Sequence, residues 1–433
     1  MPNSYVIVPC CSDLNRGDQA LVWETRRIAE DAGLKGKYYF TSEANEPVVQ
    51  SEERGFTRIL PVLEHPSRKY KNKENVRYNA TLKLKWGIVA LGDLIVSLCL
   101  LTKLGRKLLK PLLPEHTRES LEVMEDMTAL LVKGGGFFQF YGGLTSSYTA
   151  YFDAYHIFLA SRLGKPVYMM PNSLGPFDGP MVKWIVRKAL SKCCLVSARE
   201  SISRDMTACE LGVEPVLSPD LAFNLKPSQL DRSEVFAAYG IPTDRKVVAI
   251  TVRPYRFPSA DDPKAAYESF KRGVADFVEW LYDQGYIAVL VNHTLAVNSH
   301  ENDHACITDI VKMLPEERYR VISNTGYDCQ DLKRLYSFCD YIVGTRFHSV
   351  IFSLASGVPG LAISYVGNKS VGIMADMGLS DYVLHIDSVT ADELKVKFTA
   401  LLRNERDVKA KIEAYMAKMP AERAALVKLI EEA

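Results

Sequence analysis

Short apolar runs alternate with amphipathic stretches through the first 225 residues. The apolar runs are bounded by Gly, Pro or polar residues, as strands are, and they lie at 5–9, 38–40, 58–62, 129–132, 167–170 and 195–196. Residues 20–32, 147–163 and 181–191 repeat their apolar positions at a three-to-four spacing, which predicts helices between the strands. The alternation indicates a parallel sheet covered by helices on both faces.

The same pattern starts again after residue 225. Following a short helix at 233–239, strands are predicted at 247–252, 287–291, 319–322, 341–343 and 360–363, with helices at 267–283, 303–314 and 328–339. We therefore predict an α/β fold of two doubly wound, Rossmann-like domains that face a cleft. Their expected bounds are 1–225 and 226–390. Residues 391–433 are expected to form a helical extension, in which one long helix at 408–432 returns to brace the first half.

Composition and net charge exclude several classes of function. The 433 residues are 47% hydrophobic and 24% charged, which is typical of a soluble globular protein. A formal net charge of +1 provides no overall field for nucleic acid, so we expect no such partner. Nine cysteines without a Cys-x-x-Cys pair indicate reduced thiols and a cytoplasmic location. Because a strand begins at residue 5, we expect no secretory signal.

One segment, residues 82–110, differs in composition from the rest of the chain. Its apolar part, 86–101, is shorter than the ~20 residues that a membrane span needs, and Asp93 lies near its middle. Basic residues flank it on both sides, at Lys83, Lys85, Lys103, Arg106, Lys107 and Lys110. Three interpretations stay open: a helix lying peripherally on the inner face of an anionic membrane, a core helix, or the face of a homo-oligomer.

The turn at 344–349 carries the strongest chemical signal. It follows the apolar run 341–343 and opens an apolar helix, so Arg346 and His348 lie at a helix N-terminus. Packing does not require two cation-capable side chains there, whereas an anionic substrate does. A structural salt bridge is the alternative.

Two other strand ends in the first half carry candidate binding groups. Asn15, Gly17 and Asp18 follow the first strand, where Gly17 would let the backbone turn close to a ligand and the alternative is a plain helix cap. Gly134, Gly135 and Gly136 follow another strand, where successive N–H groups predict an anion nest and the alternative is a flexible turn. Neither the dinucleotide fingerprint nor a P-loop occurs, so nucleotide binding by those routes is not expected.

Further cations complete the predicted cleft. Arg199 follows the last strand of the first half, with a surface Arg199–Glu200 pair as the alternative. Arg253 and His293 end strands of the second half, and Lys369 lies beside a helix start, where it would neutralise a phosphate. His300 and His304 are four residues apart with Asp303 nearby, which is a weak metal signature, and we predict no metal.

Six motifs together resemble one family. They are Asn15-x-Gly17-Asp18-x-Ala20-Leu21, the glycines 134–136, Arg199-Glu200, Pro219-Asp220, Arg346-x-His348 and Tyr365-x-x-x-Lys369-x-x-Gly372. Their order and spacing resemble the polysaccharide pyruvyl transferase family over nearly the whole chain. Phe347 stands where we expect a leucine, a small change for an apolar spacer.

The resemblance implies a fold, a reaction and partners. The fold would be similar to that of the GT-B glycosyltransferases, with phosphoenolpyruvate in the cleft as donor substrate and no cofactor. The pyruvyl group would pass to two hydroxyls of a sugar as a cyclic ketal, in exopolysaccharide, capsule or cell-wall synthesis. The acceptor would be a sugar or a lipid-linked oligosaccharide. In this family the arginine of Arg346-x-His348 is expected to hold phosphoenolpyruvate.

The chemistry of that reaction suggests roles for two side chains. His348 is the candidate acid or base, and Arg346 and the helix N-terminus should keep its imidazole neutral near pH 7. Asp18 would orient or deprotonate an acceptor hydroxyl. The alternatives are a GT-B glycosyltransferase that uses a nucleotide sugar and a non-catalytic sugar-binding protein. Release of phosphate indicates the pyruvyl transferase, and release of a nucleoside diphosphate indicates the glycosyltransferase. Binding of sugar without turnover indicates the non-catalytic protein.

Overall fold

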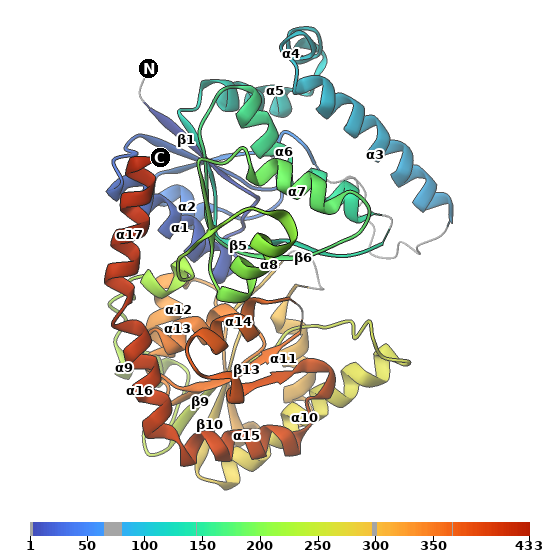
Figure 1. Ribbon diagram of the computed structural model, residues 1–433. Helices are drawn as coiled ribbons and strands as arrows, with labels where there is room; N and C mark the ends of the chain where they lie inside the picture. The colour runs from blue at the N-terminus through green and yellow to red at the C-terminus, as the bar shows by residue number, and fades with distance from the viewer. Residues whose placement is uncertain (1–2, 65–79, 144, 297–300, 366) are drawn as a thin grey trace.

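The computed structural model describes residues 3–64, 80–143, 145–296, 301–365 and 367–433. Two α/β domains lie one above the other, and the C-terminal helices run along one side of both (Figure 1). Each domain contains one parallel sheet with helices packed against it. The predicted fold class is therefore confirmed.

The first sheet has eight strands in the order β3-β2-β1-β4-β6-β7-β8, with β5 paired to β6. The strands are β1 (Ser4–Val8), β2 (Lys37–Thr41), β3 (Phe56–Ile59), β4 (Ala129–Val132), β5 (Gly135–Tyr141), β6 (Val167–Asp178), β7 (Leu195–Ala198) and β8 (Val216–Leu217). The helices are α1 (Arg16–Asp31), α2 (Val49–Glu53), α3 (Ala80–Leu100), α4 (Lys103–Leu109), α5 (Glu115–Asp126), α6 (Ser146–Arg162), α7 (Val182–Leu190) and α8 (Ser201–Leu211). All four residues of β4 are buried, as expected for a strand covered on both faces.

The second sheet has six strands in the order β11-β10-β9-β12-β13-β14. The strands are β9 (Lys246–Thr251), β10 (Tyr286–Val291), β11 (Tyr319–Ile322), β12 (Tyr341–Gly344), β13 (Gly360–Ser364) and β14 (Val383–His385). The helices are α9 (Arg232–Ala238), α10 (Pro263–Asp283), α11 (Asp303–Val311), α12 (Cys329–Tyr336), α13 (Phe347–Leu354), α14 (Lys369–Asp376), α15 (Ala391–Arg403), α16 (Glu405–Met416) and α17 (Met419–Glu432). Short 3-10 helices occur at Lys110–Leu112, Leu221–Asn224, Glu316–Arg318, Ser380–Tyr382 and Ile386–Ser388.

Chain order reverses at one point in each sheet, and these points position the site. The reversal lies between β1 and β4 in the first sheet and between β9 and β12 in the second. In open α/β sheets, ligands bind beyond the carboxyl ends of the strands at such a point. The loops after β1, β4, β9 and β12 should therefore carry the binding groups.

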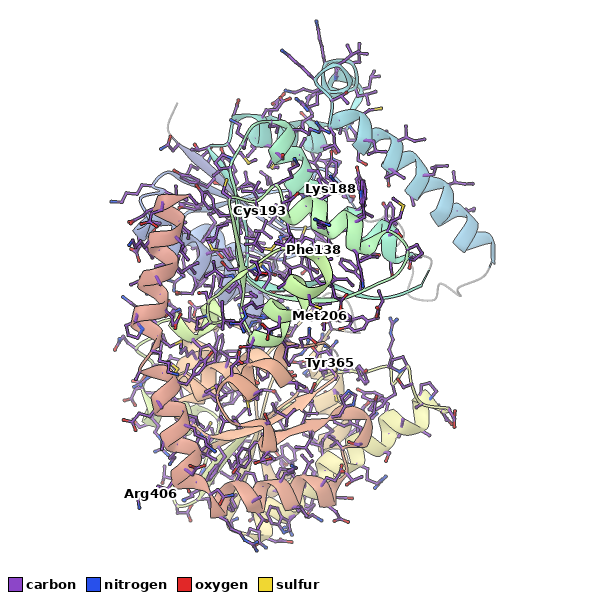
Figure 2. The ribbon with its side chains drawn as sticks, viewed as in Figure 1. Phe138, Lys188, Cys193, Met206, Tyr365 and Arg406 are labelled. Carbon is purple, nitrogen blue, oxygen red and sulfur yellow. The ribbon has the colours of Figure 1, made fainter. Side chains whose placement is uncertain are left out.

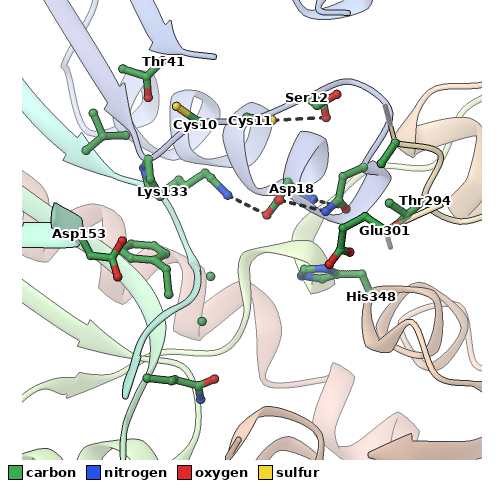
Figure 3. Close-up of a pocket in the computed structure, with 18 of the residues that line it drawn as sticks. Cys10, Cys11, Ser12, Asp18, Thr41, Lys133, Asp153, Thr294, Glu301 and His348 are labelled. Atoms are coloured by element: carbon green, nitrogen blue, oxygen red, sulfur yellow. Dashed lines mark hydrogen bonds and ion pairs between the residues drawn. The ribbon is translucent and has the colours of Figure 1, made fainter. Parts of the chain in front are cut away.

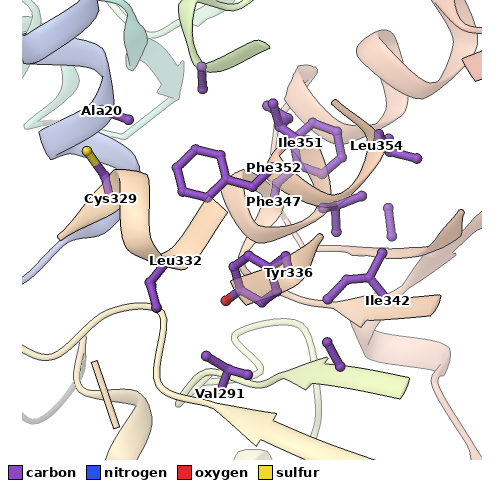
Figure 4. Close-up of a cluster of buried hydrophobic side chains, with 14 of the residues drawn as sticks. Ala20, Val291, Cys329, Leu332, Tyr336, Ile342, Phe347, Ile351, Phe352 and Leu354 are labelled. Carbon is purple, nitrogen blue, oxygen red and sulfur yellow. The ribbon is translucent and has the colours of Figure 1, made fainter. Parts of the chain in front are cut away.

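The two domains share one hydrophobic core. A continuous cluster of buried side chains joins one face of the first sheet, through α1, to the second sheet, and a separate cluster fills the other face of the first sheet. Figure 4 shows Ala20 of α1 beside Cys329 of α12, close to Phe347 and Phe352 of α13. The backbone N–H of Cys329 donates to Gln19 Oε1 of α1 at 2.8 Å. These contacts fix the first turn of α1 against the second domain.

The predicted long C-terminal helix is wrong in one respect. The helix breaks into α16 and α17, because Pro420 has no N–H to donate and its ring would clash with the carbonyl four residues earlier. The expected brace is confirmed, since α17 packs on α1 and Arg423 forms an ion pair with Asp31. The two sheets fall within the two predicted domains, while the boundary at 225 stays a prediction.

The apolar segment forms α3 and α4. Within the described ranges, no single helix combines the length and apolarity to cross a membrane. The helical segments Gly87–Leu100 and Lys103–Leu112 reach that length and apolarity only when they are taken together. The two segments are bent by 117° relative to each other.

We expect Phe398→Ala to lower the free energy of unfolding by about 3–5 kcal/mol, the usual cost of removing a buried ring. Phe398 of α15 is fully buried, and its ring lies 5.3 Å from that of Tyr341 and 5.7 Å from that of Phe277. Val396→Ala on the same helix is the control, because Val396 is 67% exposed and its loss should change stability by less than about 0.5 kcal/mol. Urea denaturation measures both, and equal losses would contradict the assigned packing.

Candidate active site in the interdomain cleft

A cavity of about 740 Å³ lies between the carboxyl edges of the two sheets. Figure 3 shows part of its lining, with Lys133 and Asp18 on the first domain and His348 on the second. Of the predicted site residues, Asn15, Asp18, Gly135, Gly136, Arg199, Arg253, His293, Arg346, His348 and Lys369 line it. Gly17 and Gly134 lie behind this lining. The topology thus brings groups from both domains to one cleft.

The first turn of α1 is capped and paired. The side chain of Asn15 accepts the backbone N–H of Asp18 at 3.3 Å, and its Nδ2 donates to Asp18 Oδ2 at 3.0 Å. The buried ammonium of Lys133 lies 2.7 Å from Asp18 Oδ1. Burial alone would raise the pKa of Asp18, but Lys133 outweighs it and the pKa is lowered. Asp18 is therefore an ionised carboxylate that faces the cleft.

Gly17 serves a contact that the sequence did not reveal. A Cβ at this position would overlap the imidazole of His348. The group that approaches its backbone in the structure is thus a side chain of the other domain, and a ligand contact at Gly17 stays a prediction.

The predicted anion nest at the glycines is also wrong. Gly135 and Gly136 begin β5, and Gly135 pairs with Asn172 of β6. Successive N–H groups of a strand point in opposite directions, so they do not converge on one anion. A Cβ at Gly136 would lie 3.1 Å from Arg199 Nη2, and one at Gly134 would lie 2.9 Å from a backbone oxygen. The glycines therefore make room for neighbouring groups.

Arg199 is buried and lines the cleft, and its pair with Glu200 is present but buried rather than on the surface, with Arg199 Nε 3.5 Å from Glu200 Oε2. It is 1% exposed, its Nη1 lies 2.7 Å from Asp220 Oδ2, and its Nε donates to Ser173 Oγ at 2.7 Å. Its Nη2 has no hydrogen-bond partner within the described structure. Nε and Nη1 of this guanidinium therefore have partners, whereas the buried Nη2 has none among the described residues.

His348 lies in the first turn of α13 between an acid and a base. Its Nε2 is 3.8 Å from Asp220 Oδ2, and the ammonium of Lys369 is 3.3–3.4 Å from the two ring nitrogens. Burial, and then the charge of Lys369, lowers the pKa of His348 to about 4. The expected neutral imidazole is confirmed, although Lys369 and burial cause it rather than Arg346 and the helix N-terminus.

Lys369 is the first residue of α14 and faces the same point. Burial, and then the charge of Arg199, lowers its pKa to about 7, against the opposing effect of Asp220. Among the described residues, no carboxylate lies within ion-pair distance of its ammonium. Near pH 7 this amine exchanges its proton readily.

Arg346 is already engaged by carboxylates. Its Nε donates to Asp303 Oδ1 at 2.7 Å, its Nη1 to Glu301 Oε2 at 3.0 Å, and its Nη2 to the backbone oxygen of Glu301 at 2.6 Å. Arg253 shares Glu301 at 3.2 Å and lies 4.3 Å from the ring centre of Tyr365. The salt bridge that we weighed for Arg346 is present, at the wall of the cleft. The role of Arg346 toward a substrate stays a prediction.

His293 lies deeper in the wall. It is 1% exposed, its Nδ1 is 3.2 Å from Tyr336 OH, and its backbone N–H donates to Asp303 Oδ2 at 3.1 Å. Burial lowers its pKa well below the ordinary value, so the ring is neutral. His300, half of the weak metal signature, lies outside the described residues, and within those residues no cluster of three or more ligands is found.

Several lining residues were missed by the sequence analysis. Lys133 directly follows β4 and precedes the glycine run, so its position in the chain was a usable signal. Asp220 was quoted only as part of a motif, and its pairing with Arg199 needed the fold. Carboxylates on the first-domain side of the cleft come from separate loops and from α6, namely Glu43, Glu46 and Asp153. No spacing in the sequence relates these three.

Where the two domains meet, Tyr365 and Met206 lie at the level of this cleft (Figure 2). Asn368, just before α14, donates to the backbone oxygens of Leu174 and Gly175 in β6 at 3.2 and 3.3 Å. These bonds fix the start of α14, and with it Lys369, to the first domain.

Comparison with known proteins identifies the family. The sequence profile described as polysaccharide pyruvyl transferase matches residues 15–368, which includes the lining cations Lys133, Arg199, Arg253 and Arg346 and ends one residue before Lys369. The chain belongs to this family. It is 25% identical over 316 residues to the amylovoran biosynthesis protein AmsJ of Erwinia amylovora, covering 69% of this chain and 71% of that protein.

Solved structures share the fold of this family member at low identity. TcCGT1 in complex with UDP gives a TM-score of 0.59 at 10% identity and covers 100% of this chain and 98% of its own. UDP-GlcNAc 2-epimerase from Neisseria meningitidis, bound to UDP-GlcNAc, gives a TM-score of 0.55 at 13% identity, with 99% and 98% covered. Both similarities confirm the GT-B arrangement of two Rossmann-like domains.

The lowered histidine pKa values give the stability of this pyruvyl transferase family member a pH dependence. A histidine with a folded pKa of about 4 resists protonation in the native state but accepts it freely when unfolded, near pH 6.5. The contribution of His348 to the free energy of unfolding is therefore complete above pH 6.5. It is lost as the pH falls from 6.5 to about 4. We expect His348→Gln to flatten this part of the profile, as measured by urea denaturation at successive pH values. His385→Gln, at an exposed histidine, is the control. An unchanged slope in His348→Gln would contradict the buried neutral imidazole.

Proposed function

We propose that this chain transfers the pyruvyl group of phosphoenolpyruvate to two hydroxyls of a sugar, forming a cyclic ketal and releasing phosphate. The observation that carries the proposal is the contact between Lys369 and His348 in the cleft, beside an arginine whose Nη2 has no hydrogen-bond partner among the described residues. This set combines anion recognition with an amine that exchanges its proton near neutral pH and a neutral imidazole in contact with it. Membership of the family supports the same reaction.

The donor carries a phosphate and a carboxylate, and the cleft offers cations for both. Lys369 and the Nη2 of Arg199 have no carboxylate partner within the described residues, so they can bind an anion without breaking an ion pair. Glu301 is 47% exposed, and its movement toward solvent would free part of Arg346. Asp303 is fully buried and would keep the guanidinium in place. A second anionic group of the donor would then take the position of Glu301.

The reaction requires the vinyl carbon to gain a proton while an oxygen attacks its neighbour. One acceptor hydroxyl adds to C2 of phosphoenolpyruvate and loses its proton, and C3 gains a proton to become a methyl group. The C2–O bond to phosphate then breaks, and the second hydroxyl closes the ketal as its proton leaves with phosphate. The Lys369–His348 pair is suited to supply the proton to C3, since the amine is half protonated near pH 7 and the neutral ring can pass a proton on.

The acceptor is assigned to the opposite wall. Asp18 is an ionised carboxylate at the edge of the cleft, and Glu43, Glu46 and Asp153 line the same side. Carboxylates accept hydrogen bonds from sugar hydroxyls, and the ring of Phe137 provides an apolar surface beside them. Because Lys133 keeps the pKa of Asp18 low, Asp18 is better suited to orient a hydroxyl than to remove its proton.

The decisive experiment measures phosphate release from phosphoenolpyruvate with acceptors containing galactose, mannose or N-acetylhexosamine. We expect release that depends on the acceptor and a product with a ketal methyl signal by nuclear magnetic resonance. His348→Gln should lower turnover by ~100-fold while phosphoenolpyruvate still binds, since a proton-transfer group is lost and the cations remain. Release of nucleoside diphosphate from a sugar nucleotide, with no phosphate from phosphoenolpyruvate, would instead support the glycosyltransferase alternative. Binding of sugars without either release would support the non-catalytic one.

Binding of phosphoenolpyruvate should take up a proton at pH 8. The free amine of Lys369, with a pKa of about 7, is mostly neutral there, and a bound anion raises that pKa and draws a proton from solution. Calorimetry in buffers of different ionisation enthalpy measures the uptake, which should approach one proton and disappear in Lys369→Met. Lys183→Met is the control, because Lys183 is exposed on α7. Uptake that persists in Lys369→Met would assign the proton to another group.

A further inference from the structure

Helices α3 and α4 lie at the outer edge of the first domain (Figure 1), and they carry exposed apolar side chains. On α3 the side chains of Ile88, Leu91, Ile95 and Leu98 are 65%, 58%, 55% and 47% exposed. Their spacing of three and four residues places them on one face of the helix. Leu104 and Leu108 of α4 add side chains that are 67% and 61% exposed. We call these six residues the α3–α4 surface.

The opposite face holds both helices to the domain. Ser97 Oγ lies 3.0 Å from the hydroxyl of Tyr151 in α6, and Leu100 is 2% exposed. Arg106 of α4 donates to the backbone oxygen of Leu100 at 2.9 Å and pairs with Glu125 of α5 at 3.5 Å. The α3–α4 surface therefore points away from a fixed support, and the interpretation of this segment as a core helix is wrong.

Charge beside the surface indicates what covers it. Residues 80–113 contain six basic residues and one acid, a formal net charge of +5 in a chain whose total is +1, so the remainder is net negative. Lys103 and Lys107 are exposed one turn apart on α4, next to Leu104 and Leu108. A second copy packed about a two-fold axis would bring these like charges together. An anionic lipid surface would neutralise them while accepting the apolar side chains.

We propose that the α3–α4 surface docks peripherally on an anionic membrane, with its apolar side chains among the lipids and Lys103 and Lys107 at the headgroups. The helix that supports the surface also lines the cleft, because Tyr151 of α6 contacts α3 and Asp153 of the same helix faces the cavity. If the proposed function holds, docking would bring the acceptor side of the cleft close to a lipid-linked sugar. The docking itself does not depend on that function.

Flotation with liposomes tests the proposal on the full chain. We expect the protein to float with vesicles of phosphatidylcholine and phosphatidylglycerol, to float poorly with phosphatidylcholine alone, and to be released by high salt. Leu91→Ser/Ile95→Ser should reduce flotation at least tenfold, because it removes apolar side chains from the surface. Lys103→Glu/Lys107→Glu should also reduce it at least tenfold, which is about the loss expected when two lysines no longer contact a charged surface. All four side chains are exposed, so circular dichroism and the melting temperature should stay unchanged.

Matched controls use exposed residues far from the surface. Val49→Ser/Val396→Ser alters apolar side chains that are 59% and 67% exposed, and Lys226→Glu/Lys264→Glu alters exposed lysines. Both should float like the native chain. Equal flotation of the α3–α4 variants, or no flotation of the native chain with anionic vesicles, overturns the proposal. It is also overturned if the native chain is a dimer that ignores vesicles and Leu91→Ser/Ile95→Ser makes it a monomer, which would assign the surface to a second copy.

Discussion

The close approach of the first turn of α1 to the first turn of α13 determines the shape of the cleft. Gly17 meets the imidazole of His348, and Gly372 of α14 meets the side chain of Glu200, with no room for a Cβ at either glycine. Arg16 donates across the same interface to the backbone oxygen of Asn324 at 3.0 Å. Because both contacts cross between the domains, they fix how far apart the walls stand. The cations and acids of the two sheets are thereby held at ion-pair distances.

Carboxylates of the cleft wall then set the state of three of its cations. Asp18 holds Lys133, Asp220 holds Arg199, and Asp303 holds Arg346, with separations of 2.7 Å in each pair. All three cations are buried, and leaving one of them unpaired would be costly, so these three pairs are structural as well as chemical. Lys369 differs, since its nearest described partner is an imidazole. Lys369, with a pKa of about 7, is therefore the member of this pair that exchanges a proton near neutral pH, while His348 stays neutral.

The sequence was sufficient for the architecture and for most of the lining. Strands with continuous apolar runs, such as residues 129–132 and 287–291, are found as β4 and β10, because a strand buried on both faces must be apolar. β5 was missed because its first residues are glycines, which favour a turn by local preference, and pairing with β6 overrides that preference. The break before α17 could have been read from Pro420. The pairing of Arg346 with Glu301 and Asp303 could not, because it depends on where the start of α11 lies relative to α13.

Proteins with the same two-domain fold bind UDP or UDP-GlcNAc. A cleft that uses phosphoenolpyruvate must therefore differ from theirs in its side chains. A nucleotide-sugar donor loses its leaving group without any carbon gaining a proton. Phosphoenolpyruvate must gain one at C3, so its enzyme needs a buried acid that releases a proton near pH 7 and sits beside the anion-binding groups. Here a lysine whose pKa is lowered by burial contacts a neutral histidine at two converging helix N-termini. This arrangement suits the protonation of phosphoenolpyruvate, whereas transfer from a nucleotide sugar has no use for it. The proposed reaction therefore rests on the electrostatics of this pair, to which the fold contributes only position.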